Sequence, residues 1–288
     1  MKAKINGTEI YFDVEGMQLR VEDGKLVEKP VCFILHGGPG MDHTDYLPNC
    51  TPLSEYMQLV YIDNRGSGRS GRPDITTCNV EQNIEDIEAL RQYLGLDKIV
   101  LFGHSYGGIT AQGYAVKYPQ NLAGLILLGT TPTYKAMVDG KAELLARGTE
   151  EQIEYGRHLF DGTFENDEHY KVYFEKLCTL YSHKRTSSAG VKEAVEYMIV
   201  SSDVINYATR NDWYGFDWTE GLKKIDVPTL VVGGAHDWIT PVKYSYQIAD
   251  AIKGSELIIY EDSGHSLFYD AGDRMIPAII QFIKKALL

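Results

Sequence analysis

Short apolar runs alternate with helical periodicities along most of this chain. Apolar runs typical of buried strands occupy Val31–Leu35, Leu59–Ile62, 99–104, Leu122–Leu128, Thr229–Val232 and Glu256–Tyr260. Apolar residues recur at helical spacing over 80–94 and helix-forming residues fill 106–118, and a final helix is predicted from about Arg274 to Leu287. Strands that alternate with helices favour right-handed crossovers and a mostly parallel sheet covered on both faces by helices. The pattern therefore predicts an α/β fold.

Two regions depart from this alternation. Near the amino terminus, Thr8–Val14 alternates polar and apolar residues, which is typical of an antiparallel strand, and 18–21 is its expected partner. From 134 to 218 the chain has several amphipathic helical patterns and no clear strand. We therefore expect one α/β core, formed by 1–133 and 219–288, that is interrupted by a helical cap over 134–218.

Composition and charge exclude several classes of partner. The 288 residues carry a formal net charge of −12, and the lysines and arginines are scattered, so a nucleic acid or an anionic membrane is not expected as a partner. No stretch is apolar for long enough to span a bilayer, and the amino terminus lacks the apolar region of a signal peptide. The expected partner is a small molecule or a short peptide, and the oligomeric state stays open.

Cysteines and known binding motifs give no sign of a cofactor. The 4 cysteines lie far apart and form no C-x-x-C pair, so free thiols in a reducing cytoplasm are expected. The chain contains no H-E-x-x-H, Walker or G-x-G-x-x-G pattern. Neither a metal nor a nucleotide cofactor is therefore expected.

The most informative motif is Gly-x-Ser-x-Gly at 103–107. It follows the apolar run 99–102 and precedes helix-forming sequence, which is the context of a sharp turn between a strand and a helix. Glycine on either side lets the strand and the helix approach closely, and the serine is then exposed at the carboxyl edge of the sheet. Ser105 is the predicted nucleophile.

A serine nucleophile needs a base, and His265 is the preferred candidate among 8 histidines. It follows the last predicted strand on a glycine turn, where a base can reach Ser105. His36 and His104 lie inside glycine turns and are expected to pack, and His43 could border the substrate. The three histidines of the predicted cap, His158, His169 and His183, are expected at the surface.

The base in turn needs an orienting carboxylate, for which Asp237 is the preferred candidate. It follows the strand Thr229–Val232 and precedes His265, as the chain order Ser, Asp, His requires. Glu261 and Asp262 are rivals on the loop of His265, and Asp63 is expected instead to anchor the turn at Arg65.

Two further groups of residues are expected to contact the substrate. Oxyanion stabilisation needs two N–H donors, and we expect these from Tyr106 and from the glycine turn 36–40, with Gly38 preferred and Gly37 next. The aromatic residues Tyr134, Trp213 and Trp238 either line an apolar pocket between cap and core or attach the cap to the sheet.

Together these residues resemble the α/β-hydrolase fold, and within it the proline iminopeptidase group of serine peptidases. The resemblance is carried by His36–Gly40, Asp63–Ser70, Gly103–Gly108, Asp237 and His265. It implies that Ser105 forms an acyl-enzyme, that His265 shuttles the proton and that Asp237 holds the imidazole. It further implies the release of an N-terminal residue, typically proline, from short peptides.

The chain departs from this family in the predicted cap. Family members bind the free amino group of the substrate with cap carboxylates, commonly from an Asn-Glu pair in the last cap helix. The nearest counterpart is Arg210-Asn211-Asp212-Trp213, with Asp in place of Glu. The resemblance therefore implies that Asp212 binds the amine, and a helix-surface aspartate is the alternative.

Two other functions stay open from the sequence. A carboxylesterase or lactonase would use the same triad on an uncharged acyl substrate. A non-catalytic receptor can share the fold, although such proteins usually lose a triad member.

Overall fold

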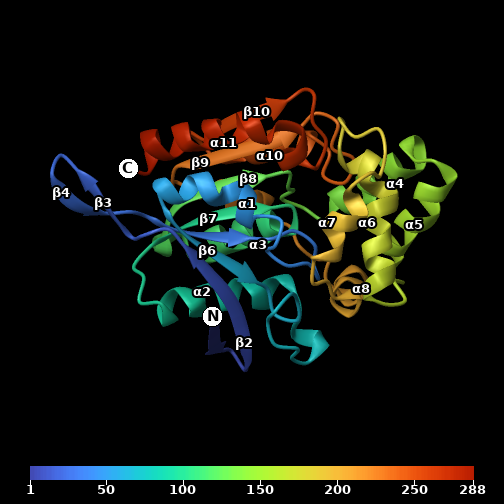
Figure 1. The fold of residues 1–288 in the computed structure, drawn as a ribbon, viewed down its shortest axis with the longest axis horizontal. Coiled ribbons are helices and arrows are strands. Elements are labelled where there is room, and N and C mark those ends of the chain that lie inside the picture. The colour runs from blue at the N-terminus through green and yellow to red at the C-terminus, as the bar shows by residue number, and fades with distance from the viewer.

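The computed structural model describes residues 1–288, and its centre is an eight-stranded sheet (Figure 1). Its strands, in spatial order, are β1 (Lys2–Ile5), β2 (Thr8–Glu15), β6 (Gln58–Asp63), β5 (Val31–Leu35), β7 (Ile99–His104), β8 (Leu122–Leu128), β9 (Thr229–Gly234) and β10 (Glu256–Tyr260). β1 and β2 pair antiparallel, β2 also runs antiparallel to β6, and every later pair is parallel. The predicted α/β-hydrolase fold with a mostly parallel sheet is confirmed.

The predicted pairing of 8–14 with 18–21 is wrong. β2 instead pairs with β1 and β6, while β3 (Leu19–Glu22) pairs with β4 (Lys25–Glu28) in a separate hairpin that projects from the body (Figure 1). Asp23 and Gly24 form its two-residue turn with φ of 49° and 75°. Asp-Gly is a strong hairpin signal because both central positions of such a turn need positive φ.

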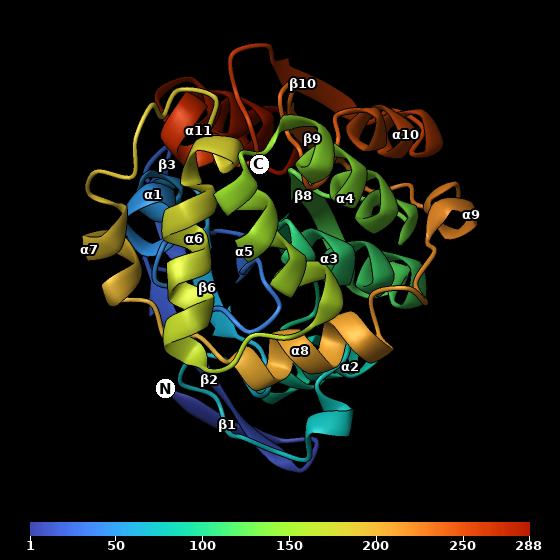
Figure 2. The ribbon, with the colours of Figure 1, turned by 90° about the vertical axis from the view of Figure 1, so that its right-hand side faces the viewer.

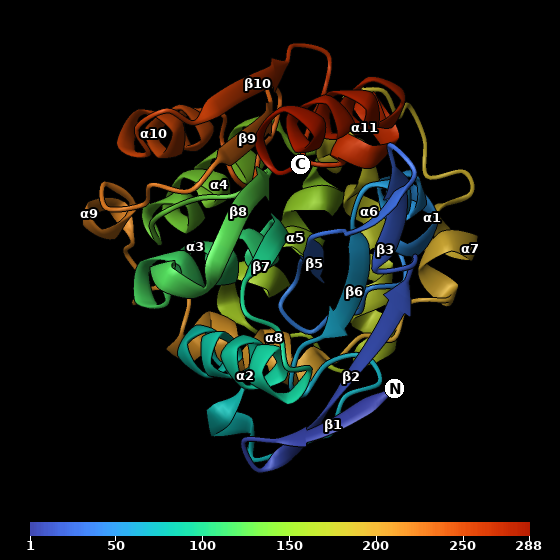
Figure 3. The same cartoon turned by 90° about the vertical axis from the view of Figure 1, so that its left-hand side faces the viewer.

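Helices cover both faces of the sheet, as Figure 3 shows with the left-hand side of Figure 1 turned toward the viewer. One face is covered by α2 (Val80–Tyr93), α3 (Tyr106–Lys117) and α10 (Lys243–Ala251), and the other by α1 (Leu47–Cys50) and α11 (Leu267–Ala286). Each face of the sheet has its own hydrophobic core, and successive strand residues alternate between them. Phe33 belongs to the core under α2, α3 and α10, and Ile34 to the core under α1 and α11. Period-two alternation thus gives a sheet that is apolar on both faces.

The last helix begins seven residues earlier than the sequence predicts, at Leu267 rather than Arg274. Leu267, Ala271 and Met275 are all buried, so the apolar stripe that defines this helix starts before the predicted range. The helix is also the longest in the structure, and it is not long and apolar enough to cross a membrane; nor is any other.

Six helices separate β8 from β9. They are α4 (Lys135–Arg147), α5 (Glu150–Asp161), α6 (Asp167–Tyr181), α7 (Val191–Glu196), α8 (Ser202–Asn211) and α9 (Thr219–Leu222). The first five, called here the inserted helices, gather at one end of the molecule, on the right in Figure 1 and toward the viewer in Figure 2. Where the chain leaves and re-enters the core, Thr133 and Asp217 form an isolated antiparallel bridge.

Asp63 anchors the glycine turn after β6, which contains Arg65, by its contact with the backbone of Arg69. Its Oδ2 accepts the backbone N–H of Arg69 at 2.8 Å, and its Oδ1 lies 2.6 Å from Nδ1 of His43. Arg65 pairs instead with Asp86 at 2.6 Å. Burial opposes the ionisation of Asp63, but the hydrogen bond and charge of His43 outweigh it and lower the pKa of Asp63 from 3.8 to about 2.

This low pKa predicts a loss of stability in acid. Because the folded carboxyl has the lower pKa, it stabilises the fold above pH 4 and the contribution disappears as pH falls toward 2, by about 2 kcal/mol in total. Asp63→Asn should therefore flatten the dependence of the urea-unfolding free energy on pH between 4 and 2. An unchanged pH dependence in this variant would contradict the assignment.

Candidate active site

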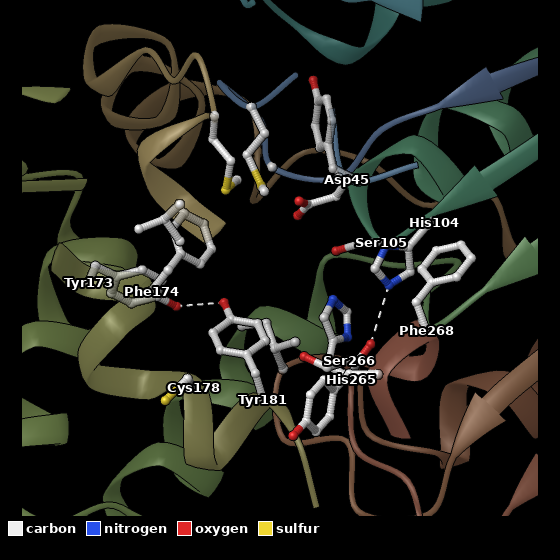
Figure 4. Close-up of a pocket in the computed structure, with 18 of the residues that line it drawn as sticks. Asp45, His104, Ser105, Tyr173, Phe174, Cys178, Tyr181, His265, Ser266 and Phe268 are labelled. Carbon is white, nitrogen blue, oxygen red and sulfur yellow. Dashed lines mark hydrogen bonds between the residues drawn. The ribbon is translucent and has the colours of Figure 1, made fainter. Parts of the chain in front are cut away.

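Ser105 lies at the sharp turn between β7 and α3, with φ of 55° and ψ of −121°. The glycines beside it are sterically required. A Cβ on Gly103 would lie 2.5 Å from the carbonyl oxygen of Gly107, and a Cβ on Gly107 would lie 2.2 Å from the carbonyl oxygen of Leu35. The turn places the Ser105 hydroxyl in a cavity (Figure 4).

The cavity has a volume of about 520 Å³ and lies between the carboxyl edge of the sheet and the inserted helices. Its wall is mostly apolar and is contributed by both parts of the chain. The inserted helices supply residues that include Met137, Leu159, Tyr173, Phe174 and Val195. Polar groups gather on the sheet side, which is the arrangement of a small-molecule site.

His265 and Asp237 meet beside this cavity, on the loops that follow β10 and β9. Nδ1 of His265 lies 2.7 Å from Oδ2 of Asp237, and both side chains are buried. Figure 4 shows the His265 ring and the Ser105 hydroxyl in the same part of the cavity. An acceptor oxygen beside Nδ1 favours the tautomer with a proton on Nδ1, which leaves Nε2 free to accept a proton.

The carboxylate of Asp237 is itself fixed. Its Oδ1 accepts the backbone N–H of Ile239 at 3.0 Å and that of Thr240 at 2.8 Å, and the Thr240 hydroxyl donates to Oδ2 at 2.8 Å. The role of Thr240 was not anticipated, although the Asp-x-x-Thr spacing is a common local capping pattern that could have indicated it.

The rival carboxylates lie elsewhere. Asp262 is partly exposed, and hydrogen bonds from Arg274 and Lys184 lower its pKa to about 2. Glu261 is exposed on the same loop.

The two predicted oxyanion donors, Gly38 and Tyr106, both line the cavity. The alternative donor, Gly37, differs from Gly38 because its N–H is already engaged in a hydrogen bond. The Gly37 N–H already donates to the Tyr46 hydroxyl at 2.9 Å. Gly38, with φ of 119°, lies at the cavity wall. The Tyr106 N–H occupies the first position of α3, where a backbone donor has no acceptor within the helix.

A chain of hydrogen bonds connects the glycine turn to the His265 loop. The Tyr46 hydroxyl accepts from Gly37 and lies 2.8 Å from Nδ1 of His104, and Nε2 of His104 lies 3.3 Å from the His265 carbonyl oxygen. Burial, reinforced by His265, lowers the pKa of His104 to about 3, so its ring is neutral. Tyr46 therefore donates to Nδ1, and Nε2–H points to the His265 carbonyl. Nothing in the local sequence indicated Tyr46.

Of the four residues expected to bind substrate, only Trp213 lines the cavity. Trp238 is fully buried and packs edge-on against Phe160 and Tyr181, so it joins the inserted helices to the core. Tyr134 stands outside the cavity at the start of α4, where its N–H bonds the Phe216 carbonyl.

Asp212 does not line the cavity either. Its Oδ2 accepts the backbone N–H of Val80 at 3.0 Å, at the first residue of α2. Burial, which outweighs this hydrogen bond, raises its pKa to about 6. His43, expected near the substrate, is fully buried against Asp63 and Tyr11. These expectations fail because the local sequence does not show which face of an element meets the cavity.

Comparisons with known proteins agree with this architecture. Residues 30–272 match the family model of the alpha/beta hydrolase fold. The chain is 36% identical over 262 residues to a proline iminopeptidase of Saccharolobus solfataricus, covering 86% of this chain and 83% of that protein. It is 30% identical over 286 residues to proline iminopeptidase PfmaB of Pestalotiopsis fici, covering 96% of this chain and 99% of that protein.

A solved structure, Est816, described as an N-acyl homoserine lactone degrading enzyme, has a TM-score of 0.73 and 25% identity, with 98% of this chain and 100% of that chain covered. The family match and the iminopeptidase relatives extend over most of the chain. The chain therefore belongs to the alpha/beta hydrolase family, as a serine-type hydrolase similar to the proline iminopeptidases.

Proposed function

We propose that this protein is a prolyl aminopeptidase that releases N-terminal residues from short peptides through an acyl-enzyme on Ser105. The observation that carries the proposal is the 2.7 Å contact between His265 and Asp237 at the cavity into which the Ser105 hydroxyl projects. The proline iminopeptidase relatives support the choice of substrate.

In this proposal, Oγ of Ser105 attacks the carbonyl carbon of the first residue while Nε2 of His265 takes its proton. Asp237 stabilises the resulting imidazolium. The N–H groups of Tyr106 and Gly38 stabilise the oxyanion. When the C–N bond breaks, His265 returns the proton to the departing amine, and water then hydrolyses the acyl-enzyme by the same proton transfers in reverse.

We further propose that 134–218 acts as a cap over the core formed by 1–133 and 219–288. The position of the inserted helices over one end of the sheet supports this division, because the cavity draws its walls from both parts. A cavity of about 520 Å³ suits a small substrate. The 4 cysteines are buried and free, which supports the proposed location in the cytoplasm.

The test compares proline p-nitroanilide with its N-acetylated analogue. We expect the free amine to be hydrolysed with a kcat/KM at least about tenfold higher, since a specific charge contact is commonly worth more than 1.4 kcal/mol. The same assay on a substrate panel distinguishes the alternatives. If the N-acetylated compound reacts equally well, the aminopeptidase assignment is wrong.

A carboxylesterase or lactonase is the second candidate. It is favoured by the apolar wall of the cavity and by the similarity to Est816. Faster turnover of p-nitrophenyl butyrate or of an acyl lactone than of any amide would support it.

A further inference from the structure

Asp45 is the one carboxylate among the residues that line the cavity. It precedes Tyr46, in the segment between β5 and α1. Figure 4 shows its carboxyl group pointing into the cavity that also receives the Ser105 hydroxyl. The residue is exposed to solvent, although the surrounding protein partly desolvates its carboxyl group.

This carboxylate has no partner in the protein. No hydrogen bond or ion pair reaches its oxygens, although its backbone carbonyl accepts from Asn49 at 2.7 Å. Arg185, the cavity's one arginine or lysine, stacks on the Tyr269 ring at 3.8 Å and donates to the Ala189 carbonyl at 3.3 Å. The lining therefore holds an unpaired negative charge beside the proposed nucleophile.

The neighbouring Asp42 shows the contrast. Its Oδ2 pairs with Arg69 at 3.0 Å and accepts the Thr44 hydroxyl at 2.6 Å, and it does not line the cavity. Burial, with the charge of Asp42, raises the pKa of Asp45 to about 6. A carboxylate that has no partner in the protein attracts a positive charge, so a bound cation would be favoured at this position.

The backbone that carries Asp45 is held in place relative to the reacting groups. The adjacent Tyr46 hydroxyl accepts the Gly37 N–H at 2.9 Å and bonds Nδ1 of His104 at 2.8 Å. His104 directly precedes Ser105, so the backbone that carries Asp45 is tied to both the glycine turn and the nucleophile strand. Because the backbone is held in this way, only the Asp45 side chain has to become ordered when a cation binds.

We propose that Asp45 binds the free N-terminal ammonium group of the substrate. The inference rests on the proposed aminopeptidase function and assigns to Asp45 the role that the sequence suggested for Asp212. In an N-terminal residue the amine is two bonds from the carbonyl carbon that Ser105 attacks. The group that binds it must therefore line the same cavity as Ser105, which Asp45 does and Asp212 does not.

The test uses Asp45→Asn, which keeps the shape and removes the charge, and Asp212→Asn as the matched comparison. At pH 8, Asp45→Asn should lower kcat/KM for proline p-nitroanilide by about 10²-fold, mainly through KM, because a desolvated charge pair is lost. Hydrolysis of p-nitrophenyl butyrate should change less than about twofold, since that substrate has no cation to pair. Asp212→Asn should leave both rates near those of the wild type.

A second measurement separates failure of this inference from failure of the proposed function. L-Prolinamide should inhibit p-nitrophenyl butyrate hydrolysis by the wild type, and Asp45→Asn should weaken that inhibition about 10²-fold. Loss of inhibition only in Asp45→Asn supports the ammonium site even if anilides are not hydrolysed. Equal losses on anilide and ester, unchanged inhibition in Asp45→Asn, or an anilide defect in Asp212→Asn would overturn it.

Discussion

Ser105→Ala is expected to lower kcat/KM at least about 10⁴-fold on every substrate that the protein hydrolyses, while the fold is retained. The physical reason is that no other hydroxyl replaces the attacking oxygen. His265→Ala should cause a loss of similar size, because the serine then keeps its proton at the moment of attack. The measurements are steady-state hydrolysis and thermal unfolding of each variant.

Labelling by a fluorophosphonate probe gives an independent readout. The wild type should be labelled, and Ser105→Ala should not. Ser188→Ala, which removes an exposed hydroxyl between α6 and α7, is the matched control and should be labelled normally. Persistent labelling of Ser105→Ala would show that the nucleophile is another residue. A wild type that is neither labelled nor active would favour a non-catalytic receptor.

Gly107→Ala is expected to prevent folding. The added Cβ would lie 2.2 Å from the Leu35 carbonyl oxygen and 2.7 Å from that of His36. Both are backbone atoms at the end of β5, so α3 would have to move off the sheet, a change that costs more than about 4 kcal/mol. The measurement is the soluble yield and the midpoint of thermal unfolding.

Gly272→Ala in α11 is the control for this substitution. A Cβ there meets nothing within 4 Å, and alanine favours the helix by up to about 1 kcal/mol. It should therefore leave the unfolding temperature unchanged or raise it. A soluble Gly107→Ala protein with a normal melting temperature would show that the contact between α3 and β5 is looser than described.

Much of the architecture was predictable because buried strands leave a recognisable pattern of apolar residues in the local sequence. β5, β7 and β9 lie between other strands with both faces covered, so they appear as short, continuous apolar runs. Their boundaries followed from the glycine turns after them. β1 was missed because Lys2–Ile5 alternates two lysines with only two apolar residues, which is too short to separate from a loop.

The candidate catalytic residues could be predicted from the sequence for a related reason. Ser105, Asp237 and His265 each follow a recognisable strand, and the carboxyl ends of parallel strands meet at one edge. A side chain's place in the chain therefore indicated its place in space. Their joint catalytic role stays a prediction until the variants above are measured.

The residues expected around the substrate could not be predicted in this way. Asp45 and Asp212 are both aspartates beside an aromatic residue, and neither follows a strand directly. Only the packing of the inserted helices against the sheet edge decides that one carboxylate enters the cavity while the other accepts a backbone N–H of α2. Strand order and the order of the candidate triad are local, periodic properties of the chain, whereas the cavity wall forms from segments that are distant in sequence, so tertiary structure alone determines it.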